Sequence, residues 1–125
     1  MGHTSYRDLE VWHKAMNLVV ECYKLTRDFP KHEIYGLSSQ MQRAAVSIPA
    51  NIAEGRERQH RKEFIQHISI ANGSVAELET HIQIAARLGY VNEHTLDLLL
   101  QRTSEIGRML NGLMQVLNKK LTAAP

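Results

Sequence analysis

Apolar residues recur every three or four positions along most of this chain, which is the spacing of one helix face, and the two-residue alternation of strands is nearly absent. The pattern predicts helices near residues 6–28, 34–55, 60–88 and 93–120, followed by a disordered tail at 121–125. Because short links join these segments, the 125 residues are predicted to form one domain, an antiparallel up-down-up-down four-helix bundle. The predicted fold class is therefore all-α.

Prolines and glycines mark the ends of these segments. The first helix is predicted to stop before Pro30, because proline disfavours helix in the residue before it, and the third is predicted to end at Gly89. The second helix keeps one apolar phase on both sides of Pro49, so a continuous helix is expected there. Pro49 removes the amide that would bond the carbonyl of Ala45, and its ring presses on that turn. We therefore expect helix 2 to be bent at Pro49.

Polar residues form a continuous line on the other side of the second predicted helix. They are Gln40, Arg43, Ser47, Asn51 and Glu54, at spacings of three and four. One interpretation is a solvated face. The other is a structural polar network in which Arg43 and Asn51 are partly buried, with Glu77 brought near Arg43 by antiparallel packing of the second and third helices. Catalysis is not expected, because the line contains no pair of nucleophile and base.

The first predicted helix carries two apolar stripes. One runs through Trp12 and Val19, and we place it in the bundle core. The other consists of Val11, Ala15, Leu18, Cys22 and Leu25. A helix that is apolar over most of its circumference must be covered on more than one side. We therefore predict that this second stripe is an oligomer interface; the alternative is one wide core-facing surface with a few exposed aliphatic side chains.

The link between the second and third predicted helices, Gly55 to Glu63, is rich in charge. Its cations are Arg56, Arg58, Arg61 and Lys62, against the acids Glu57 and Glu63. A turn of this kind is usually only solvated. Repeated around an oligomeric ring, however, its cations would contact the phosphates of RNA or DNA without reading bases.

No sequence motif demands a cofactor, a metal or a membrane. Glu10 and His13 match the Glu-x-x-His spacing of di-iron bundles, but such a site needs a second copy, so no metal is expected. Cys22 is a lone cysteine, and with no secretion signal visible the cytoplasm is the expected location. Apolar runs fall far short of the roughly 20 residues that span a bilayer. The net charge of +2 neither demands nor excludes a nucleic-acid partner.

Three segments carry a resemblance to a known family. They are "LEVWHKA" at Leu9–Ala15, "YGLSSQMQRAAVSIPANIAEG" at Tyr35–Gly55 and "GSVAELE" at Gly73–Glu79. The chain closely resembles the bacterial 23S rRNA intervening-sequence protein family over nearly its whole length. The resemblance implies a small four-helix bundle that assembles as a ring-like homopentamer and has no established enzymatic activity.

These observations support three hypotheses for function. The leading one is a non-enzymatic oligomeric scaffold or adaptor for a protein partner. The second is a weak, sequence-nonspecific RNA- or DNA-binding protein that acts through the basic turn, and a contiguous basic rim would favour it. The third is a bundle metalloenzyme, which metal analysis of the purified protein would test.

Overall fold

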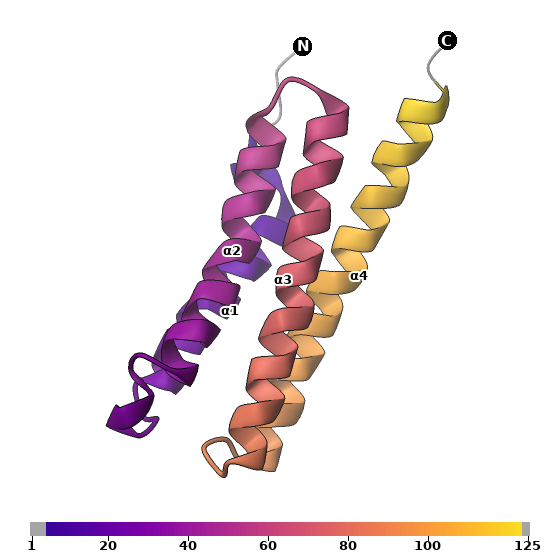
Figure 1. The fold of residues 1–125 in the computed structure, drawn as a ribbon. Coiled ribbons are helices and arrows are strands. Elements are labelled where there is room, and N and C mark those ends of the chain that lie inside the picture. The colour runs from indigo at the N-terminus through magenta and orange to yellow at the C-terminus, as the bar shows by residue number, and fades with distance from the viewer. Residues whose placement is uncertain (1–4, 124–125) are drawn as a thin grey trace.

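The structure is a computed structural model that describes residues 5–123 and contains four long helices (Figure 1). The helices are α1 (Glu10–Thr26), α2 (Leu37–Glu57), α3 (Arg61–Arg87) and α4 (Glu93–Ala123), with 3-10 turns η1 (Tyr6–Asp8) and η2 (Lys31–Glu33) before α1 and α2. No strand occurs within residues 5–123. The predicted all-α class and four-helix bundle are confirmed. Of the predicted disordered tail, residues 121–123 are helical, and residues 124–125 lie outside the described part.

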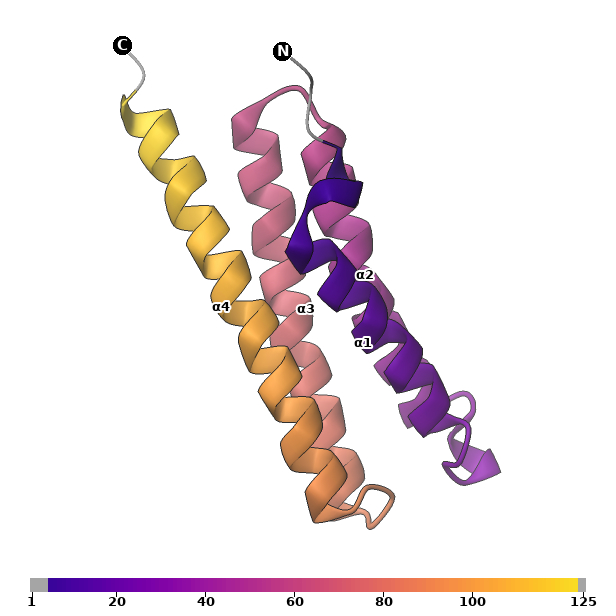
Figure 2. The ribbon, with the colours of Figure 1, turned by 180° about the vertical axis from the view of Figure 1, so that it is seen from behind.

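Successive helices run in alternating directions. Figure 1 shows α1 leading away from the end of the bundle that holds both termini, α2 returning to it, α3 leading away and α4 returning. Seen from behind in Figure 2, α3 lies between α4 on one side and the α1–α2 pair on the other. The end with the termini therefore also holds the turn between α2 and α3, and the opposite end holds the other two connections.

The core draws fully buried side chains from every helix. Examples are Leu18 of α1, Ile52 of α2, Leu78 of α3 and Leu110 of α4. Burying a side chain of this size contributes roughly 1.5–3 kcal/mol, so the repeated apolar stripes supply most of the driving force for packing. Pro49 is also buried, and α2 continues through it from Leu37 to Glu57. The bend at Pro49 stays a prediction.

Helix α1 buries a different face from the one that its sequence suggested. The stripe predicted as an oligomer interface consists of Val11, Ala15, Leu18, Cys22 and Leu25; four members are buried in the core, and Leu25 packs partly buried against it. Side chains that are buried within one chain offer no surface to a second chain. This interface prediction is therefore wrong.

Ion pairs with α4 lie beside the buried stripe of α1. Lys14 pairs with Glu105 at 3.4 Å, and Glu21 pairs with Arg102, so one flank of α1 is held against α4. The two stripes of α1 are both apolar, so their spacing could not decide which one faces the core. The charged residues on the flank agree with the observed orientation, because in it Lys14 and Glu21 meet partners on α4.

The end of the bundle opposite the termini is closed by polar caps, and we call it the capped end. The Glu33 carboxylate accepts hydrogen bonds from the Leu37 amide at 3.0 Å and from the Tyr90 hydroxyl at 2.9 Å. The Asn92 side chain accepts from the Thr95 amide at 2.8 Å and so caps the start of α4. The exposed backbone groups of this end thus meet partners from the chain itself.

Gly89 completes the capped end because it adopts a backbone conformation that other residues avoid. Its φ is +82°, and the amide of Tyr90 donates to the carbonyl of Ala85 at 2.9 Å, while that of Gly89 donates to Ala86 at 3.0 Å. This pair of bonds is the Schellman motif, which satisfies the last carbonyls of α3. The prediction that α3 ends at Gly89 is accurate to within two residues.

None of the helices within residues 5–123 is long and apolar enough to cross a membrane.

Candidate functional site

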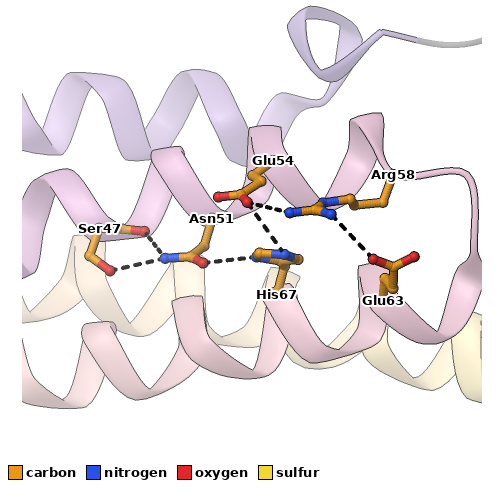
Figure 3. A network of polar contacts seen from close by, with 6 residues as sticks. All are labelled: Ser47, Asn51, Glu54, Arg58, Glu63 and His67. Carbon is orange, nitrogen blue, oxygen red and sulfur yellow. Dashed lines mark hydrogen bonds and ion pairs between the residues drawn. The ribbon is translucent and has the colours of Figure 1, made fainter.

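A chain of polar contacts joins α2 to α3 near the end that holds the termini (Figure 3). The Asn51 amide donates to the Ser47 carbonyl at 2.9 Å and to its hydroxyl at 3.1 Å. The Asn51 oxygen lies 3.0 Å from Nδ1 of His67 on α3, and the Ser74 hydroxyl donates to that of Ser47 at 2.8 Å. These part-buried bonds fix the register of the two helices.

Gly55 lets α2 and α3 approach closely beside this network. A Cβ atom at position 55 would lie 2.6 Å from Cβ of His67 and 3.1 Å from the Phe64 ring. Because Cβ of His67 is attached directly to the α3 backbone, that contact cannot be relieved by a side-chain rotation. Gly55 is therefore required for the packing of two helices, and α2 continues past it to Glu57 rather than ending there.

Arg58 is bound to two carboxylates and is not a free cation. Its guanidinium donates to Glu54 at 2.7 Å and to Glu63 at 3.4 Å, as Figure 3 shows. The hydrogen bond from Arg58 lowers the pKa of Glu54, and the nearby His67, 3.8 Å away, lowers it further. Of the predicted basic turn, Arg58 thus serves to tie the α2–α3 connection together.

The structure brings together only part of the predicted polar network. Ser47, Asn51 and Glu54 belong to the observed contacts, each through a bond to a neighbouring polar group. Arg43 and Glu77 are both exposed and, among the described residues, form no ion pair with each other. The proposed pairing of Arg43 with Glu77 is therefore wrong.

Sequence reasoning missed His67 and Ser74, which are the α3 partners of this network. His67 lies four residues from Glu63, so its spacing suggested an ordinary contact within one helix. Its observed partners lie on α2 instead. These contacts depend on the register between α2 and α3, which cannot be predicted from the residue pattern of either helix alone.

A cleft of about 510 Å³ opens at the end that holds the termini, and we call it the end cleft. Its walls come from the start of α1, the α2–α3 turn and the last turns of α4, which diverges from α3 toward this end in both views (Figures 1 and 2). Its apolar side chains are those of Leu9, Phe64, Leu113 and Leu117. Its cations are Arg56, Arg58, Arg61 and Lys120. Among the described residues, no acidic side chain lines it.

Large apolar side chains are exposed together on one face, which we call the α1–α2 face. They are Met16 (40% exposed), Val20 (51%) and Tyr23 (46%) of α1, and Val46 (41%) of α2. The α1 members share a side of the helix by their spacing. Val46 follows Gln42 by one turn, and the Gln42 amide donates to Thr26 of α1 at 3.0 Å, so Val46 lies on the same seam.

The described residues offer no obvious centre for catalysis. Within residues 5–123, no three side chains of histidine, cysteine, aspartate or glutamate lie together as metal ligands would. Burial raises the pKa of the Cys22 thiol to about 12, which suppresses its thiolate form at neutral pH.

The sequence profile of the 23S rRNA-intervening sequence protein family matches residues 7–112. The chain belongs to this family. A solved structure with the same fold is a protein of unknown function from the S23 ribosomal protein family of Bacteroides thetaiotaomicron. It is 25% identical, with a TM-score of 0.75 over 83% of this chain and 97% of that one. No curated protein matches the sequence.

The region matched by the family profile includes some of the observed sites and excludes part of the end cleft. The polar network between α2 and α3 lies inside the matched region of residues 7–112. Three residues of the end cleft, namely Leu113, Leu117 and Lys120, lie beyond that region, on the last turns of α4. The family match therefore covers the α2–α3 side of the cleft and leaves out its α4 wall.

Proposed function

We propose that this protein is a non-enzymatic oligomeric scaffold, an adaptor that presents several copies of one surface to a protein partner. The observation that carries the proposal is the α1–α2 face. It combines side chains of Met16, Val20, Tyr23 and Val46 that are each at least 40% exposed in the single chain. Exposed apolar patches rimmed by polar residues mark interaction surfaces in soluble proteins.

A second copy of this chain is the occupant that we assign to the α1–α2 face. Complete burial of a large apolar side chain contributes roughly 1.5–3 kcal/mol, so covering the half-exposed part of each contributes about half of that. The family resemblance implies five copies, and a homopentamer is the expected form. This interface replaces the buried stripe that periodicity had suggested, and it uses the opposite flank of α1.

Light scattering coupled to size exclusion tests the proposal. The wild-type chain should elute as an oligomer of its 14.2 kDa subunit at micromolar concentration. Val20→Glu places a charge on the α1–α2 face and should shift the protein to the monomer. The matched control is Gln83→Glu, because Gln83 is exposed on α3 away from that face. A monomeric wild type, or equal effects of the two substitutions, would overturn the self-association.

A second candidate is weak binding of RNA or DNA through the α2–α3 turn. The observation that favours it is that Arg56, Arg61 and Lys62 take part in no ion pair among the described residues, unlike Arg58. Binding should then be indifferent to base sequence. When the logarithm of the binding constant is plotted against the logarithm of the salt concentration, the slope should become shallower by roughly 0.7–0.9 for each phosphate contact removed. The double substitution Arg61→Gln with Lys62→Gln should flatten that slope in mobility-shift titrations, while Arg102→Gln, far along α4, should leave it unchanged.

A further inference from the structure

We propose that the end cleft is a binding site for a small amphiphilic anion, a molecule with an apolar body and a carboxylate or phosphate head. The site is separate from the α1–α2 face, so the inference goes beyond the scaffold function and does not depend on it. It rests on three features of the cleft: its size, its apolar floor and its uncompensated cations.

The size and the floor suit the body of a small organic molecule. Ligand pockets commonly enclose about 300–1,000 Å³ and are lined mainly by apolar side chains with a few polar groups. The end cleft measures about 510 Å³. Leu9, Phe64, Leu113 and Leu117 are partly or largely buried, and all four line the cleft. An apolar body placed there would remove part of their apolar surface from water.

The cations suit the head group. Arg56 comes from the end of α2, Arg61 from the start of α3 and Lys120 from the last turns of α4, so separate helices aim one positive charge each at the same cleft. None of these three residues forms an ion pair among residues 5–123, whereas Arg58 is held by Glu54 and Glu63. Charge-assisted hydrogen bonds to arginine are among the stronger polar contacts that a carboxylate or phosphate makes.

The start of α3 adds to the positive potential. His60, the N-cap residue of α3, makes no side-chain hydrogen bond to the amides of the first turn. A long helix carries a partial positive charge at an uncapped start, which favours an anion nearby. This partial charge adds to the attraction that the arginines exert on an anion, and it would not bind an anion without them.

A second charged cleft of the molecule shows a contrast. A cleft of about 290 Å³ between α1 and α4 is lined by Lys14 and Arg102, but also by Glu21 and Glu105. Its cations are paired with those acids within the chain. An anion would have to displace existing ion pairs there, whereas Arg56, Arg61 and Lys120 of the end cleft form no ion pair among residues 5–123. The end cleft therefore offers an anion unpaired cations that this α1–α4 cleft does not.

Amphiphilic anions reach a protein as free molecules or as part of a lipid bilayer, and we assign the end cleft to the free form. The cleft is a hollow at one end of the bundle, bounded by three segments of the chain, and not a flat face. A hollow encloses a single molecule, whereas a bilayer surface would meet only its rim. Vesicles of anionic phospholipid serve as the comparison that separates the two sources.

Isothermal titration of the full-length protein with decanoate, below its micelle-forming concentration, tests the proposal. Decanoate should bind with one site per chain. Decyltrimethylammonium, which has the same tail and the opposite charge, and inorganic phosphate, which has the charge without the tail, should each bind at least about tenfold more weakly. Equal binding of either probe, or binding of anionic vesicles without binding of free decanoate, would overturn the proposal.

Matched variants locate the site. Arg56→Gln and Leu113→Ala should each weaken decanoate binding about tenfold or more. Arg108→Gln and Leu88→Ala, which change the same residue types at exposed positions outside the cleft, should leave it unchanged. Lys120→Gln, at an exposed position near the end of α4, provides a second charge variant that leaves the packing of α2 and α3 intact.

Methyl and amide chemical shifts decide where the ligand lies. Decanoate should perturb Leu9, Phe64 and Leu117, whose side chains line the end cleft. Perturbations confined to Met16, Val20 and Tyr23 would show binding to the exposed α1–α2 face instead and would overturn the assignment. Oligomeric state is measured separately, so a failure here leaves the scaffold proposal standing, and the reverse also holds.

Discussion

The two ends of the bundle differ in how their polar groups are satisfied. At the capped end, backbone groups and side chains satisfy one another: Glu33 caps α2, Asn92 caps α4 and Gly89 ends α3. At the end cleft, α3 begins without a side-chain cap, and cations surround an apolar hollow. The first arrangement closes a fold. The second leaves Arg56, Arg61 and Lys120 without an ion pair among residues 5–123, so that they can contact a ligand.

The comparison also separates stability from recognition. Contacts at the capped end and in the α2–α3 network are made by groups that have no role in the end cleft, apart from Arg58. Substitutions in the first set should change the free energy of unfolding, and substitutions at Arg56 or Lys120 should change binding only. Three experiments probe how far this division holds, from the largest expected effect to the smallest.

The largest effect is expected from Gly55→Ala, next to the end cleft. The new methyl group would lie 2.6 Å from Cβ of His67, and forcing extra atoms into a packed interface costs roughly 1–3 kcal/mol. Gly73→Ala is the control, because a methyl group there meets nothing within 4 Å and removing a glycine from a helix interior stabilises by roughly 0.5–1 kcal/mol. Urea unfolding measures both.

Gly36→Ala extends the same test to the capped end. A methyl group at position 36 would lie 2.9 Å from Oε1 of Glu33, which is the far end of a flexible side chain. That carboxylate can move, so the destabilisation should be smaller than for Gly55→Ala. A Gly36→Ala variant that is less stable than Gly55→Ala would show that the capped end, rather than the α2–α3 contact, is the more rigid region.

Substitutions at the helix caps should have a smaller effect on the free energy of unfolding, and the effect should have opposite signs at the two ends. Asn92→Ala removes the bond to the Thr95 amide and should destabilise the fold by about 1 kcal/mol. His60→Asn supplies a cap that α3 lacks and should stabilise the fold by up to about 1 kcal/mol. Thermal unfolding of the two variants compares them. No gain from His60→Asn would mean that the amides at the start of α3 already have partners.

The number and approximate bounds of the helices could be read from the sequence because each apolar stripe has its own period and its own stop signals. The predicted segment at 60–88 corresponds to α3 at Arg61–Arg87, and Gly89 marks its end in both. Periodicity within one helix carries this information, so no knowledge of the neighbouring helices is needed.

The rotation and register of the helices could not be predicted in the same way. Both stripes of α1 are apolar, and which one is buried depends on contacts with other helices, such as those of Lys14 and Glu21 with residues about 80–90 positions away in α4. Besides its bonds to Ser47 of its own helix, Asn51 contacts His67 of α3, and the α1–α2 face arises only when α1 and α2 lie side by side. Contacts between helices decided each of these features.

The smallest effect concerns two carboxyl groups with lowered pKa values, one toward each end. Hydrogen bonds from the Leu37 amide and the Tyr90 hydroxyl lower the pKa of Glu33, whereas the charged Arg58 and then His67 lower that of Glu54. Both groups are more acidic in the folded chain than in the unfolded one. Each therefore stabilises the fold above the ordinary glutamate pKa of about 4.3, and this contribution is lost as the pH falls through the folded pKa.

Salt should distinguish the two carboxyl groups, because high salt weakens exposed ion pairs such as Arg58–Glu54 and leaves hydrogen bonds from neutral donors largely unchanged. In carboxyl carbon NMR titrations, the pKa of Glu54 should rise toward its ordinary value at high salt, while that of Glu33 stays low. Arg58→Gln should raise the pKa of Glu54 alone, and Tyr90→Phe that of Glu33 alone. Equal salt sensitivity at both sites would show that the capped end depends on charge as much as the end cleft does, which would remove the difference between the two ends.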